Sequence, residues 1–107
     1  MSERIQKEIW LKHVGELIRE KRYALGREFQ SREFFVMDRS ENLFQYEEWI
    51  STRYLASIEL GNNQMSIEKL IQIAYALEID PADLFTDVVK IYQENAHAQE
   101  KSMRQLE

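Results

Sequence analysis

The sequence predicts an all-α domain of about five helices joined by short turns. Its 107 residues include one Pro and three Gly, and apolar residues recur three and four positions apart, which is the spacing of a helix face. Stretches with the alternating pattern of a β-strand are scarce. The length and the 44% hydrophobic content fit one folded domain with a modest core.

The first helix is expected from about residue 4 to Leu25, with Gly26 as its C-cap. One face of that helix would hold the apolar residues Ile5, Ile9, Val14, Leu17, Ile18 and Leu25. Ser31 is a candidate N-cap for a second helix whose Phe34 and Phe35 turn inward. The segment that follows, ENLFQYEEW at 41–49, could be a loop, a bent helix or an irregular turn.

The second half of the chain contains clearer boundary signals. Ser51 can cap a helix over 52–60, and Gly61 can end it. Ser66 can cap another helix over 67–77. The residues of that helix that fit one apolar face are Ile67, Leu70, Ile71, Ala74 and Leu77.

The dipeptide Asp80-Pro81 marks the start of the last helix, because Asp can act as its N-cap and Pro fits its first position. Its apolar residues begin with Leu84, Phe85, Val88 and Val89, and the pattern could continue through Ile91 and Tyr92. After Gln93 the apolar stripe fades. Residues 94–107 are therefore expected to fray or to be disordered.

The helix predicted over 52–60 divides its side chains unevenly. Leu55 and Ile58 form a narrow apolar stripe, and the opposite face is left with Thr52, Arg53, Tyr54 and Ser57. Two short helices joined by a turn, the second with a polar outer face, describe a helix-turn-helix whose second helix enters the DNA major groove. A single Arg there can bond both O6 and N7 of guanine, which discriminates by about 1–3 kcal/mol.

Motifs spread over about 60 residues resemble, in the same order, the Cro/C1 (XRE) type helix-turn-helix domain of bacterial and phage repressors. The stretch ISTRYLASIELGNNQMSIEKLIQIAYALEIDPADLF, residues 50–85, is similar to the second half of that domain, including the Ile-Glu-x-Gly that ends at Gly61. VGELIREKRYALG, residues 14–26, resembles its first helix. The resemblance implies a five-helix lambda-repressor-like fold with an insertion before the recognition helix and a C-terminal helical extension.

The spacing between the first and third helices is about a dozen residues longer than in this family. The preferred alignment starts the second helix at Ser31, buries Phe35 and Val36, and places the insertion at about 40–49. The competing alignment starts that helix at Ser40 and would bury Gln45. The expected division is an N-terminal helical extension at 1–12, the helix-turn-helix domain at 13–87 and a C-terminal helical extension or tail at 88–107.

The resemblance also implies which residues contact double-stranded DNA. They are Ser31 and Arg32 at the start of the second helix, Thr52, Arg53, Tyr54 and Ser57 on the recognition helix, and Asn62 and Asn63 after it. Family members usually bind as homodimers to half-sites about one helical turn, ~34 Å, apart. The candidate dimer contacts are the last helix, through Val88, Ile91 and Tyr92, and the N-terminal extension, through Ile5, Ile9 and Trp10.

The net charge of −5 argues mildly against nucleic acid, but its distribution matters more. Residues 1–39 hold nine Lys or Arg and seven Asp or Glu (+2), whereas residues 40–87 hold two and nine (−7). A locally basic face is sufficient, because phosphate attraction acts within about 10 Å. The chain has no Cys, two His and no Gly-rich phosphate loop, so no enzyme activity, metal site or cofactor is expected. Without a membrane-length apolar run or a signal-peptide core, it is expected in the cytoplasm.

The alternative function is a protein-interaction module on the same fold, such as an antitoxin or a peptide-responsive adaptor. The negative net charge and the acidic insertion favour it. The apolar residues of the insertion could enlarge the core or form part of a partner surface; they are Leu43, Phe44, Tyr46 and Trp49. Tyr54 could pack on the insertion instead of DNA, and Glu59 is expected to be a structural partner of Arg19 or Arg22.

Overall fold

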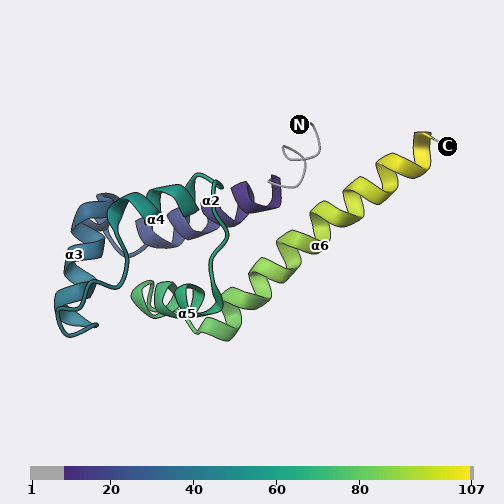
Figure 1. Ribbon diagram of the computed structural model, residues 1–107. Coiled ribbons are helices and arrows are strands. Elements are labelled where there is room, and N and C mark those ends of the chain that lie inside the picture. The colour runs from purple at the N-terminus through teal and green to yellow at the C-terminus, as the bar shows by residue number, and fades with distance from the viewer. Residues whose placement is uncertain (1–8, 107) are drawn as a thin grey trace.

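The computed structural model describes the backbone of residues 9–106 and the side chains of residues 9–96. That part of the chain contains five α-helices, one short 3-10 helix and no strand, so the predicted all-α class is confirmed (Figure 1). The elements are α2 (Ile9–Tyr23), η1 (Arg27–Gln30), α3 (Arg32–Asn42), α4 (Thr52–Glu59), α5 (Ile67–Ala76) and α6 (Pro81–Leu106). Residues 4–8 of the predicted first helix, with Ile5, lie outside the described part.

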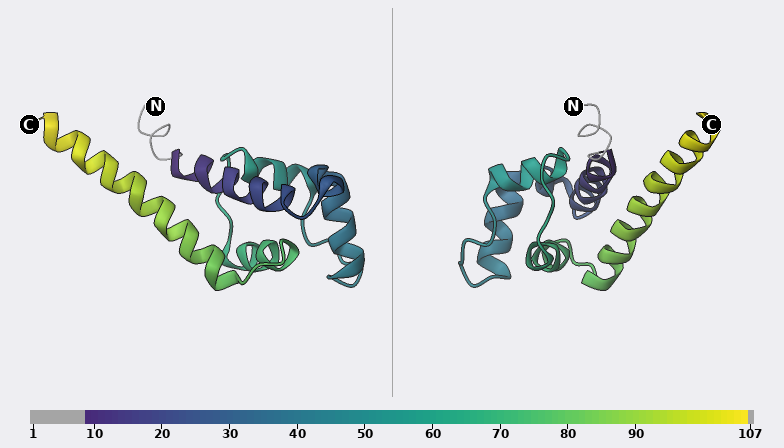
Figure 2. Two further views of the ribbon diagram at one scale, coloured as in Figure 1. Left: turned by 180° about the vertical axis from the view of Figure 1, so that it is seen from behind. Right: turned by 45° about the vertical axis from the view of Figure 1, so that its right-hand side comes forward.

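Helix α2 is the central element of the domain, because it contacts η1, α4 and α6. Helix α3 contacts η1 and α4, and α5 contacts α6. Figures 1 and 2 show α3 at one end of the molecule and the far end of α6 at the other. Between α3 and α6, α4 lies on one side of the domain and α5 on the opposite side. Helix α2 therefore packs directly on α4, and it is connected to α3 through η1.

Four predicted helix starts are confirmed by their caps. The side chains of Ser31, Ser51 and Ser66 each accept a hydrogen bond from the backbone N–H three residues later, at 3.2, 3.0 and 3.1 Å. The carboxylate of Asp80 accepts from the N–H of Ala82 at 2.7 Å, immediately after Asp80-Pro81. Each cap satisfies a backbone donor that has no partner within its helix. The prediction that the second helix begins after Ser31 is thus confirmed, and the competing start at Ser40 is wrong.

Helix α2 ends at Tyr23, two residues before the predicted end at Leu25. The guanidinium of Arg22 donates hydrogen bonds to the carbonyls of Phe29 and Gln30, both at 2.7 Å. These bonds hold the chain in a tight turn over the end of α2, and the turn continues into η1. Sequence periodicity does not report such a turn, because it depends on one long side chain reaching back to the backbone.

Two residues expected on the buried face of α5 lie on its surface. Ile67 is 77% exposed and Ile71 is 37% exposed, whereas Ile73 is fully buried. The buried stripe is Leu70, Ile73, Ala74 and Leu77. Both this stripe and the predicted one satisfy the spacing of an amphipathic helix, so periodicity alone cannot choose between them. The packing of α5 against its neighbours determines which of these residues are buried.

Helix α6 continues to Leu106, so the expectation of fraying or disorder after Gln93 is wrong for the backbone up to that residue. The segment 94–106 contains no Gly, Pro or β-branched residue and is rich in strong helix formers. The fading stripe therefore indicated the end of packing rather than the end of the helix. The first part of α6 packs on the body through Leu84, Val88 and Ile91, and the remainder extends away from it (Figure 2).

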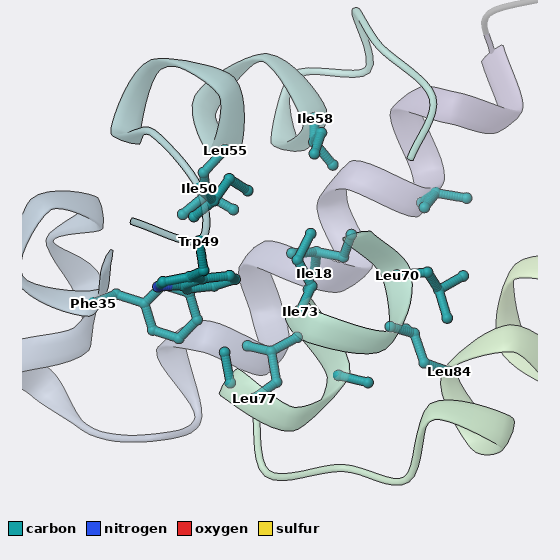
Figure 3. Packing of buried hydrophobic residues seen from close by; sticks show 13 residues of the cluster. Ile18, Phe35, Trp49, Ile50, Leu55, Ile58, Leu70, Ile73, Leu77 and Leu84 are labelled. Atoms are coloured by element: carbon teal, nitrogen blue, oxygen red, sulfur yellow. The ribbon is translucent and has the colours of Figure 1, made fainter. Parts of the chain in front are cut away.

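The residues predicted to be an insertion, 40–49, belong partly to the end of α3 and partly to the turn that follows it. Residues 40–42 are helical, and 43–51 lead back to α4. Trp49 is only 3% exposed and packs beside Phe35, with ring centroids 5.9 Å apart (Figure 3). The ring centroid of Phe44 lies 4.8 Å from that of Trp49. The aromatic residues Phe44 and Trp49 thus enlarge the core, whereas Tyr46 remains 78% exposed.

Two glycines allow close approach of backbone segments within the core. A Cβ at Gly15 of α2 would lie 2.3 Å from the carbonyl oxygen of Glu59 and 2.6 Å from that of Ile58. Gly61 has a φ of +81° and lies against the backbone of Lys12, where a Cβ would come within 2.6 Å of Cα. These two close approaches, at Gly15 and at Gly61, fix the distance between α2 and the last turn of α4.

We predict that Gly15→Ala lowers the free energy of unfolding by about 2 kcal/mol, because the added methyl group has no space and α4 must move. Urea denaturation measures the loss. Glu20→Ala, at an exposed position of the same helix, is the control and should change stability little. A Gly15→Ala protein as stable as the control would contradict the packing of α2 on α4.

Candidate nucleic-acid interface

Helix α4 buries one narrow face and exposes the other. Leu55 is fully buried and Ile58 is 2% exposed, and both reach from α4 into the core (Figure 3). On the opposite face Arg53 is exposed, while Thr52 and Ser57 are partly exposed. None of the inserted aromatic side chains covers this ridge, since Phe44 and Trp49 pack towards α3. The polar face that the sequence predicts is therefore accessible.

A shallow groove of about 690 Å³ runs between the start of α3 and the start of α4. It brings together four of the predicted DNA contacts: Ser31, Arg32, Thr52 and Arg53. Two helix N-termini meet at this groove, and their first backbone N–H groups suit an anionic ligand such as phosphate. The sequence did not indicate that Tyr23 and Gln30 also line it, because the turn through η1 that places them was not predicted.

A buried network of charged groups lies beneath the groove. The carboxylate of Glu59 accepts from Nε and Nη2 of Arg22, at 2.8 and 2.7 Å, and from Nε of Arg32 at 2.8 Å. The Arg22 and Glu59 side chains are 1% and 0% exposed. The prediction that Glu59 is a structural partner of an arginine is confirmed, with Arg22 and not Arg19 in that position. The network joins α2, α3 and α4.

Arg32 has a different environment from the one predicted for it. It lines the groove, but its Nε donates to Glu59 and its side chain is 31% exposed. The exposed carboxylate of Glu33 lies on the same groove. Removal of Arg32 would therefore disturb the buried network as well as any phosphate contact, so Arg32→Ala cannot serve as a clean probe of binding.

The other predicted contacts form a second group near the end of α4. The side-chain amide of Asn63 donates to Oγ of Ser57 at 2.6 Å, and the hydroxyl of Tyr54 donates to the carbonyl of Gln64 at 3.4 Å. Tyr54 is partly buried against the core and borders a hollow beside Trp49. Asn62 is exposed, and its backbone N–H donates to the Ser57 carbonyl. This group therefore connects α4 to the loop that follows.

The positive charge of the groove comes from Arg53 and from the network below it. Glu59 balances only one of the two positive charges of Arg22 and Arg32, and Arg53 forms no ion pair with any side chain of residues 9–96. Within the described residues no group of His, Asp and Glu could hold a metal ion, and no helix is long and apolar enough to cross a membrane. No protein-family profile, curated protein or solved structure matches the chain.

We predict that Glu59→Gln destabilises the protein by roughly 3–5 kcal/mol, because it leaves the buried charge of Arg22 without its counter-ion. Chemical denaturation monitored by circular dichroism measures the change. Glu33→Gln removes an exposed carboxylate from the same surface and should change stability by less than about 1 kcal/mol. Equal stabilities of the two variants would argue against the network as the support of α4.

Proposed function

We propose that this chain is a sequence-specific DNA-binding transcriptional regulator, a repressor that acts in the cytoplasm and has no enzyme activity. The observation that supports this function best is the exposed polar ridge of α4, with Arg53 beside the groove between α3 and α4. The opposite face of α4 is fixed by Leu55, Ile58 and Glu59. Such a helix can enter a major groove without giving up any of its own core contacts.

In this proposal α4 lies in the major groove and the start of α3 lies over the phosphate backbone. An α-helix with its side chains is about 10–12 Å wide, and the major groove is about 12 Å wide. Arg53 reads a guanine through O6 and N7, and Thr52 and Ser57 offer hydroxyl groups at shorter range. The N–H groups at the start of α3, beside Ser31, and the amide of Asn62 contact phosphates.

A homodimer on two half-sites completes the proposal, because one domain of this size covers little DNA. The sequence-based hypothesis places its contact on the last helix or on the N-terminal extension. Val88 and Ile91 pack on the core of their own chain, and Trp10 packs against Tyr92 with centroids 5.2 Å apart. The two candidate dimer surfaces thus meet each other within one chain. Tyr92 and Ile9, which are 54% and 41% exposed, are the members of these surfaces that remain accessible to a second copy.

We predict that selection from a random pool of duplex DNA yields a two-fold symmetric consensus. Arg53→Ala should lose the preference at one base pair in each half-site, which corresponds to about 1–3 kcal/mol against the correct base. Lys90→Ala removes an exposed positive charge on α6 and is the matched control. A selected pool without consensus, or the same consensus from Arg53→Ala, would overturn the assignment of α4.

A second candidate is a protein-interaction module that does not bind DNA, and the net charge of −5 favours it. Salt dependence separates the two. If about four phosphates are neutralised, DNA affinity should fall by roughly a hundredfold between about 50 and 200 mM salt, because counter-ions are released. Fluorescence anisotropy with the selected duplex measures this slope. A flat salt dependence, or no binding to any duplex, favours the interaction module.

A further inference from the structure

The last part of α3 and the turn after it expose large apolar side chains, and two of these, Met37 and Tyr46, line a hollow. Met37 is 51% exposed, Leu43 is 44% exposed and Tyr46 is 78% exposed. The hollow has a volume of about 270 Å³, and Met37, Tyr46, Trp49 and Ile50 contribute to its lining. Exposed apolar side chains that gather around a concavity are typical of a surface that binds another molecule. We call this area the insertion surface; its residues are Met37, Glu41, Leu43, Tyr46, Glu47, Glu48, Trp49 and Ile50.

The insertion surface is held in one shape by contacts beneath it. The backbone N–H of Tyr46 donates to the Ser40 carbonyl at 2.7 Å, and the Ser40 hydroxyl donates to the Glu47 carbonyl at 2.8 Å. The indole N–H of Trp49 donates to the Val36 carbonyl at 3.3 Å. Tyr46 is therefore exposed although its backbone is fixed. Because this turn is already ordered, binding of a partner would cost little conformational entropy there.

The charge around the hollow is negative. Glu41 and Glu48 line it, Glu47 is exposed in the same turn, and the segment 40–52 contains no Lys or Arg. The arginine that precedes this segment, Arg39, forms ion pairs with Asp38 at 3.7 Å and with Glu78 at 3.2 Å. The three carboxylates are thus not neutralised by the segment that presents them. Electrostatic complementarity requires positive charge on the partner.

Three other occupants fit this surface poorly. DNA phosphates would be repelled by the three carboxylates. A second copy of the chain that met this face about a two-fold axis would place the same three carboxylates opposite one another. A described terminal segment of the same chain would have to reach this surface from a distance, because the start of α2 points away from α3 and the far end of α6 lies at the opposite end of the molecule (Figures 1 and 2). The acidic rim and the apolar hollow together therefore select a different, basic protein.

We propose that the insertion surface docks a basic segment of a partner protein, with a large apolar side chain of that segment in the hollow beside Tyr46 and with Lys or Arg residues on either side of it facing Glu41, Glu47 and Glu48. The hollow provides the apolar contact, and the carboxylates orient the segment and exclude acidic competitors. This proposal does not rest on DNA binding by α4, because the two surfaces share no residue.

The test selects peptides from a random 12-residue phage library against the full chain and then measures binding of the synthetic peptides by fluorescence anisotropy. We expect enriched peptides to contain at least two Lys or Arg around a large apolar residue. Tyr46→Ser should weaken their binding at least tenfold. Tyr75→Ser, which alters a 54%-exposed tyrosine on α5, is the matched control and should bind as the unmodified chain does.

The charge requirement is tested separately with a triple variant, Glu41→Gln, Glu47→Gln and Glu48→Gln. It should weaken the basic peptides at least tenfold and reduce the dependence of their binding on salt. Circular dichroism confirms that each variant is folded. Enriched peptides without positive charge, equal binding to Tyr46→Ser and Tyr75→Ser, or self-association that Tyr46→Ser abolishes in light scattering would each overturn the proposal. Loss of duplex binding by Arg53→Ala would leave it standing.

Discussion

The buried network of Arg22, Glu59 and Arg32 is the interaction on which the rest of this domain depends. Helix α4 has only eight residues and would be marginal in isolation, so its position must come from tertiary contacts. A buried carboxylate is tolerated only when its lone pairs are satisfied, and three N–H groups of two arginines satisfy Glu59. The Nη1 atom of Arg22 also donates hydrogen bonds to the carbonyls of Phe29 and Gln30, which precede α3. One charged cluster thus fixes the angle between α3 and α4, which is the geometry that any function of this pair requires.

The same network restricts how the surface above it can vary. Arg32 belongs both to the network and to the lining of the groove, so its replacement alters the support and the surface together. Arg53, by contrast, has no described side-chain partner and can change without cost to the fold. The insertion lies on the other end of α3 and leaves this arrangement intact, because its aromatic residues add to the core beside Phe35. The domain therefore separates one surface that is tied to its buried network from another that lies at its edge.

The helix starts were predictable because Ser31, Ser51, Ser66 and Asp80 satisfy a local requirement that involves only the next few residues. The polar face of α4 was predictable for a similar reason, since Leu55 and Ile58 leave no other stripe to bury. The buried face of α5 was not, because two stripes fit the same period and only packing distinguishes Ile67 from Ile73. The turn through η1 and the bond between Ser57 and Asn63 depend on side chains that reach other segments. The length of α6 does not follow from the fading apolar stripe after Gln93, because that stripe reports where packing ends and not where the helix ends.

The bond from Asn63 to Ser57 has a consequence for the chemistry of the ridge on α4. The Ser57 oxygen already accepts one hydrogen bond, at 2.6 Å, so its own hydroxyl proton remains free to turn outward. The oxygen also keeps a second lone pair, so Ser57 can either donate or accept a hydrogen bond at this point of the ridge. The bond from Asn63 positions this oxygen relative to the loop, so a ligand on the ridge would meet a hydroxyl group that is already placed but can still rotate its proton.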